Sequence, residues 1–250
     1  MLSDIFKPNK NSVRLILIMI VVTLIGIGLA KLYYDNLNRS KDPRTAIARE
    51  LYKSYSMAVK KNDFDLALSS LNQMTVQYGN IPHYRESYEM GVVETYIAGI
   101  YLTRALYHSP ETLEKNSNLS LAEKRLLNSI EIYKNWEAKI RVMKAAELAK
   151  WIRSDFSEIK ENRETIIEKR IEDIQEALRE IPRRYSGTYA NLGIIKRHKG
   201  DIKGAIGYYQ HAIKLWPENH DAINNLRVLM GKDPKKRGVI EKLFPKKRKQ

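Results

Sequence analysis

The stretch Ser186-Gly-Thr-Tyr-Ala-Asn-Leu-Gly193 precedes a basic segment and then Gly200-Asp201, a pair typical of a turn between two helices. After that turn, Ala205, Tyr209 and Ala212 stand at positions i, i+4 and i+7, which share one face of an α-helix. Antiparallel helices approach closely only where small residues meet, and Gly193 and Ala205 supply such a meeting point. The sequence therefore predicts a helical hairpin over residues 186–219.

This pattern resembles the tetratricopeptide (TPR) repeat, a helix–turn–helix unit of about 34 residues. The residues that match the slots of the family are Tyr189, Leu192, Gly193, Ala205, Tyr209, Ala212 and Pro217. One slot departs from the family, because Lys196 stands where an aromatic residue is usual. We expect weaker packing there and a charge left in the groove.

A single unit of this kind cannot bury its apolar face, so stacking neighbours are expected on both sides. Residues 47–80 read as a degenerate repeat, in which Ser54 and Tyr55 replace the usual Leu-Gly. Residues 221–231 have the pattern of a further first helix and are interpreted as a capping helix. The predicted fold is all-α, a TPR-like α-solenoid of about nine helices over residues 43–231.

The chain between the two repeats is predicted to consist of helices joined by short loops. Residues 84–108 read as one helix, residues 116–118 as loop, and Ser120 with Glu123 as a capping box. Further helices are expected at 136–152 and 158–181. The second of these carries a 4-3-4-3 apolar seam, formed by Ile167, Ile171, Ile174, Leu178 and Ile181. The seam fits packing within a solenoid, with a coiled-coil dimer as the alternative.

The N-terminal region contains an uncharged apolar run over residues 15–30, flanked by Arg14 and Lys31. We interpret residues 13–34 as a single transmembrane helix, between a short tail at 1–12 and a linker at 35–42. A cleaved signal peptide is the alternative, since Gly28-Leu29-Ala30 offers small residues at the right place. The run is longer than a usual signal-peptide core, which favours the anchor.

The orientation of the anchor has two readings. Three basic residues precede the run and five follow within about twenty residues, which would place the large domain in the cytoplasm. Large domains, however, translocate with little regard to charge, and a short basic tail before an apolar run resembles a signal-anchor. We expect an inner (cytoplasmic) membrane protein whose soluble domain lies in the periplasm.

The charge of the chain is concentrated at its C-terminus. The formal net charge is +15, and residues 232–250 form a basic tail that is predicted to be disordered. The tail could contact anionic lipid, nucleic acid or an acidic protein, or it could only aid solubility. Its last basic cluster also resembles a nuclear import signal. A membrane anchor argues against nuclear import and makes nucleic acid an unlikely partner.

No catalytic signature is present in the sequence. The chain has no cysteine, and its five histidines are scattered without ligand spacing. We therefore predict neither an enzyme nor a cofactor or metal site.

The expected function is binding of other proteins on the surface lined by the first helix of each pair. In the clear repeat this surface should present Asn191, Ile194, Lys196, Arg197 and His198, whose charges would favour an acidic segment of a partner. Usage rich in Ile, Lys, Asn and Tyr suggests an AT-rich bacterial source. Anchored basic TPR chains of this size resemble assembly components of envelope machines, such as the periplasmic collar of spirochaete flagellar motors. The alternative is a cytoplasm-facing receptor or chaperone adaptor that recruits clients to the membrane.

Overall fold

The computed structural model describes residues 19–27, 29, 31, 39–108 and 112–235, and every regular element in these ranges is helical. The predicted all-α class is therefore confirmed. The chain from residue 43 onward contains, in order, η1 (Pro43–Thr45), α2 (Ala46–Lys60), α3 (Phe64–Gly79), α4 (Pro82–Arg85), α5 (Tyr88–Thr103), the π-helical turn η2 (Arg104–His108), α6 (Thr112–Arg141), α7 (Ala145–Asp155), α8 (Arg163–His198), α9 (Ile202–Leu215) and α10 (His220–Leu229).

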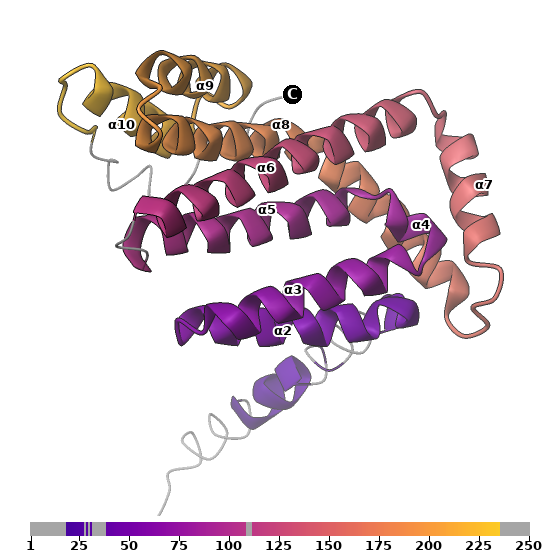
Figure 1. Cartoon of the computed structure of the whole chain (residues 1–250). Helices are drawn as coiled ribbons and strands as arrows, with labels where there is room; N and C mark the ends of the chain where they lie inside the picture. The colour runs from indigo at the N-terminus through magenta and orange to yellow at the C-terminus, as the bar shows by residue number, and fades with distance from the viewer. Residues whose placement is uncertain (1–18, 28, 30, 32–38, 109–111, 236–250) are drawn as a thin grey trace, which may run out of the picture.

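Three antiparallel helix pairs stack on one another, α2 with α3, α5 with α6, and the C-terminal half of α8 with α9 (Figure 1). Helix α7 runs along one side of the stack and connects α6 to α8. Helix α10 packs against α8 and α9 at the end of the stack. Each pair thus contacts mainly the pairs next to it in sequence.

The first and last pairs turn in the same way. Asn62 and Gly200 take positive φ angles of 57° and 81°, and an aspartate follows each of them. Asp63 accepts from the backbone N–H of Leu66 at 3.0 Å, and Asp201 accepts from that of Gly204 at 2.8 Å. A left-handed residue followed by an N-cap thus reverses the chain at both places.

In two of the pairs, a glycine beside a tyrosine ring allows the two helices of the pair to approach closely. A Cβ atom added to Gly193 would lie 2.5 Å from the Tyr209 ring, across the α8–α9 contact. A Cβ atom added to Gly91 would meet the Tyr133 ring at the same 2.5 Å, across the α5–α6 contact. The α5–α6 pair therefore has the same glycine–tyrosine packing as the α8–α9 pair.

The core runs through the whole stack in three adjoining groups of apolar side chains. One group lies between α2, α3 and α5, a second between α5, α6, α7 and α8, and a third between α8, α9 and α10. The apolar seam of α8 belongs to the second group, with Ile167, Ile174 and Ile181 at 0–1% exposure. The seam packs within the chain, as the solenoid interpretation expected.

Helix α6 differs from the prediction at both ends. It runs unbroken through residues 116–118 and Ser120, where a loop and a capping box were expected, and it ends at Arg141. Leu119, Ala122 and Leu126 are fully buried, so packing outweighs the weak helix propensity of the asparagines and serines. The single helix expected at 136–152 is in fact the end of α6 and the separate α7.

Helix α8 is one continuous helix of 36 residues that contains Pro182. Separate helices were expected, one ending at 181 and another starting near 186, because proline removes a backbone hydrogen bond at a cost of about 3 kcal/mol. Ile181 and Ser186 on either side are buried, and their contacts hold the helix through the proline. Residues 158–162, assigned to the same helix, precede its observed start at Arg163.

The helix expected over residues 84–108 is also divided. It separates into α4 and α5 at Glu86 and Ser87, and it ends in a π-helical turn. The buried hydroxyl of Ser87 donates to the carbonyl of Tyr84 at 2.8 Å, which stabilises the break.

Half of the predicted anchor and half of the linker lie outside the described residues, as do residues 1–12 and 236–250. Residues 19–27 are helical, and their large apolar side chains, including Met19, Val22 and Leu24, are about 50–60% exposed. Within the described ranges, no helix combines the length and the apolar character that a membrane crossing needs.

Candidate protein-binding pocket between α8 and α10

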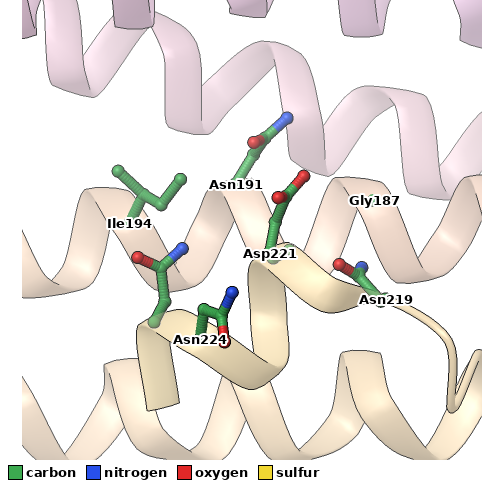
Figure 2. A pocket seen from close by; sticks show the side chains of 8 residues that line it. Gly187, Asn191, Ile194, Asn219, Asp221 and Asn224 are labelled. Carbon is green, nitrogen blue, oxygen red and sulfur yellow. The ribbon is translucent and has the colours of Figure 1, made fainter. Parts of the chain in front are cut away.

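A pocket of about 400 Å³ lies between the C-terminal half of α8 and α10 (Figure 2). Both helices contribute to its lining, which consists of Gly187, Ala190, Asn191, Ile194, Asn219, Asp221, Asn224 and Asn225. Gly187 and Ala190 leave room because their side chains are small, while asparagines supply most of the polar groups. Such a volume suits a few side chains of a bound segment.

Asn219 fastens α10 to α8 at one edge of the pocket. Its side-chain oxygen accepts from the backbone N–H of Ala222 at 2.9 Å and caps α10. Its amide nitrogen donates to Ser186 Oγ at 2.8 Å, and Ser186 Oγ in turn donates to the carbonyl of Ala212 at 2.7 Å. One chain of hydrogen bonds therefore fixes the relative positions of α8, α9 and α10.

The remaining polar groups of the lining differ in what they bind. The Asn224 amide makes two hydrogen bonds with the backbone of Lys235, accepting at 2.8 Å and donating at 3.3 Å. The side chains of Asn191, Asn225 and Asp221 make no hydrogen bond or ion pair with any other described residue. Two amides and one carboxylate are thus available to a bound segment.

Of the five residues predicted to bind a partner, two line this pocket. Asn191 and Ile194 lie on its α8 side, where Figure 2 labels them. Arg197 and His198 lie one turn further on and are half-buried, with Arg197 Nη2 and His198 Nε2 3.3 Å apart. Burial, and then the charges of Arg197 and Lys115, lower the pKa of His198. These two residues form no part of the pocket lining.

Lys196 is engaged in an ion pair instead of facing the groove as a free cation. Its Nζ lies 3.0 Å from Glu123 Oε1 on α6, and only 27% of its side chain is exposed. The hydrogen bond to Glu123 raises the pKa of Lys196. Lys199 bonds the other oxygen of Glu123 at 2.6 Å. The expectation that Lys196 leaves a charge in the groove is therefore wrong, and the atypical slot helps to join α8 to α6.

The charges that were expected to attract an acidic segment do not line the pocket. Asp221 is its one charged lining residue. The lining therefore offers amide groups and a single negative charge, which suit the backbone of an extended segment with a basic or neutral side chain near Asp221.

The residues predicted to form the repeat lie mainly in α8 and α9. Leu192, Ala205, Tyr209 and Ala212 are fully buried. Tyr189 stacks on Tyr208 with ring centroids 6.0 Å apart and meets His211 edge-on at 4.3 Å. Helix α9 ends at Leu215, two residues before Pro217.

None of the residues on the α10 side of the pocket was among those predicted to bind a partner. Asn225 follows Asn191 by 34 residues, the length of one TPR unit, so a continued repeat pattern would place the two amides at equivalent positions. This spacing could have identified Asn225. It was overlooked because the region was interpreted only as a capping helix.

A second polar cluster is buried where α4, α5, α7 and α8 meet. Arg170, 4% exposed, forms an ion pair with Glu89 and lies 4.3 Å from the centre of the Tyr84 ring. His83 packs 4.2 Å from Trp151, and both of its ring nitrogens lack a hydrogen-bond partner among the described residues. Burial, and then nearby cations with Arg170 first, lower the pKa of His83 to about 3. The close packing of aromatic rings gives this cluster a role in stability.

Within the described ranges, no three histidine, aspartate or glutamate side chains are grouped closely enough to hold a metal ion.

No profile of a known protein family matches the chain, and no curated protein matches it in sequence. The resemblance to the TPR family therefore depends on the residues and the helix packing described above.

Proposed function

We propose that the protein is a membrane-anchored scaffold that binds other proteins and assembles or stabilises an envelope complex. The observation that carries the proposal is the pocket between α8 and α10, with its unengaged amides of Asn191 and Asn225. We further propose that the stacked helix pairs form a TPR-like solenoid, in which the first helices of successive pairs line the binding surface. The glycine–tyrosine packing at Gly193 and at Gly91 supports this architecture.

The proposed ligand of the pocket is an extended segment of a partner protein. A side-chain amide can both donate to and accept from a peptide backbone, which gives affinity without demanding one sequence. The two bonds between Asn224 and the backbone of Lys235 illustrate this mode within the chain itself. Asn191 and Asn225 carry the same chemistry and are half-exposed.

Anchoring is supported by the uncharged run of residues 15–30 and by the exposed apolar side chains of residues 19–27. An anchor would raise the effective concentration of the pocket near membrane complexes. We propose an inner-membrane location with the helical domain in the periplasm, where a flagellar-motor collar is one candidate assembly. The excess of basic residues after the run favours the alternative, a cytoplasm-facing receptor or adaptor. Alkaline phosphatase and green fluorescent protein fused to the C-terminus would separate the two, because each is active on one side only.

The test of the binding surface replaces both unengaged amides, Asn191→Ala with Asn225→Ala. The matched control, Asn72→Ala with Asn128→Ala, removes two exposed asparagines from α3 and α6. Each variant is purified from its native cells in detergent, and co-purifying envelope proteins are quantified by mass spectrometry. We expect partners in fixed ratio with the wild type and the control, and at least about a tenfold loss with the pocket variant. Equal recovery with both double variants would refute the pocket as the binding surface.

A further inference from the structure

The C-terminal segment reverses direction after α10 and returns along that helix. Gly231 has a φ of 69°, a left-handed conformation that glycine adopts without strain. The backbone N–H of Lys232 donates to the carbonyl of Arg227 at 2.8 Å, and that of Gly231 donates to the carbonyl of Val228 at 3.0 Å. This turn sends the following residues back toward the N-terminal end of α10.

Two side chains of α10 then hold the returning segment in a regular register. Arg227 Nε donates to the carbonyl of Asp233 at 2.7 Å, and Asn224 bonds both backbone groups of Lys235. From Asp233 to Lys235 the segment advances by two residues, while its partner on α10 changes from Arg227 to Asn224, three residues closer to the N-terminal end of the helix. Continued by one more step, this register would pair Asp221 with residue 237, which is an arginine.

The extended segment covers more distance in each step than the helix beside it, so it has enough length to cross into the pocket. Three residues of α-helix advance about 4.5 Å, whereas two extended residues cover about 6.6 Å. The spare length lets the segment move sideways from α10 toward α8 with each step. Asn224 itself lines the pocket, so the segment is already at the pocket edge at Lys235.

The chemistry of the pocket complements the residues that follow. Asp221 is exposed, is the charged residue of the lining, and has no ion-pair partner among the described residues. Residues 236–250 contain seven lysines and arginines against one glutamate. Their covalent attachment at the pocket edge gives them an effective concentration in the millimolar range, which a separate partner seldom reaches.

We propose that residues 236–239 of the basic tail occupy the pocket between α8 and α10, with Arg237 ion-paired to Asp221. The chain then covers the site in cis, and a partner segment must displace the tail to bind. The docking of the tail requires no partner, whereas the competition with a partner segment rests on the proposed function.

The absence of cysteine from the sequence allows a direct test in the full chain, purified in detergent. Asn191→Cys with Gly238→Cys places one thiol in the pocket and one in the tail. The control pairs Val228→Cys, exposed near the other end of α10, with the same Gly238→Cys. Disulfide formation under a mild oxidant is followed by mass spectrometry, and circular dichroism verifies that each variant keeps its helical content. We expect the pocket pair to close about tenfold faster than the control pair.

Charge reversal then identifies the ion pair. Asp221→Lys in the pocket pair should slow closure severalfold, and adding Arg237→Glu should restore it, because the swapped charges attract again. Equal closure rates for the two pairs, or a rate that ignores the charge reversal, would overturn the proposal and leave the pocket open to a segment of another protein. The disulfide experiment measures docking of the tail, whereas the recovery experiment measures binding of partner proteins. The tail proposal and the proposed function can therefore fail separately. Deletion of residues 236–250 should increase recovery of partners if both hold.

Discussion

Adding one methyl group to Gly91 tests whether the α5–α6 pair is packed as closely as the α8–α9 pair. In Gly91→Ala the new Cβ would lie 2.5 Å from a ring carbon of Tyr133, a residue only 2% exposed. Overpacking of this kind costs about 1–3 kcal/mol, whereas replacing glycine by alanine in a helix gains about 0.5–1 kcal/mol. The net expectation is a loss of about 0.5–2 kcal/mol in the free energy of unfolding.

Gly99 provides a matched control on the same helix. A Cβ atom added there meets nothing within 4 Å, so Gly99→Ala should stabilise the protein by about 0.5–1 kcal/mol. The difference between the two variants isolates the overpacking at Tyr133. Thermal unfolding in detergent, followed by circular dichroism, should separate their melting temperatures by about 4–8 °C if the difference is about 2 kcal/mol.

The α8–α9 pair offers the same comparison. Gly193→Ala meets the Tyr209 ring, whereas Gly207→Ala on α9 meets nothing within 4 Å. We expect the same order of melting temperatures in both pairs. If Gly91→Ala proves as stabilising as Gly99→Ala, the close approach of α5 and α6 does not exist, and the likeness between the two pairs is refuted.

Three further predictions concern stability. Because the pKa of His83 is about 3 in the folded chain, below its ordinary 6.5, the free energy of unfolding should be fully retained above pH 6.5 and fall as the pH approaches 3, by up to about 1.4 kcal/mol per pH unit. His83→Phe should remove this part of the slope in urea titrations, and an unchanged slope would contradict the prediction. Asn219→Ala should cost about 1–2 kcal/mol and speed hydrogen exchange in α10, while Asn72→Ala should do neither. Ala205→Glu buries a charge at a fully buried position and should lower the free energy of unfolding by several kcal/mol. An unchanged melting temperature would exclude the proposed packing of Ala205 between α9 and α8.

Sequence patterns identified those contacts that form between neighbouring parts of the chain. Gly193, Ala205 and Tyr209 fall within one repeat length of about 34 residues, so their spacing is visible by inspection. Gly91 and Tyr133 make the same kind of contact but are further apart in the sequence, because Gly91 lies near the start of α5 and Tyr133 lies toward the end of α6. No fixed spacing marks such a pair.

Helix ends were predicted less well where burial opposes local preference. Pro182 and the polar residues before Leu119 both suggest a break, yet their neighbours are buried and the helices continue. The role of Lys196 was equally hidden, since its partner Glu123 lies on a helix far away in the sequence. The candidate pocket was anticipated on its α8 side alone, because its other side depends on how α10 folds back.

The continuity of α8 has a mechanical consequence. At 1.5 Å per residue the helix is a rod about 54 Å long, and a tilt of about 5° at one end moves the other by about 5 Å. Its N-terminal end follows α7, whose last residue, Asp155, bonds Arg44 of η1 at 3.0 Å. A tilt of α8 at its N-terminal end would therefore move the α8 side of the pocket, which lies near its C-terminal end. Pro182 lacks one backbone hydrogen bond, so it is the point at which this lever would bend.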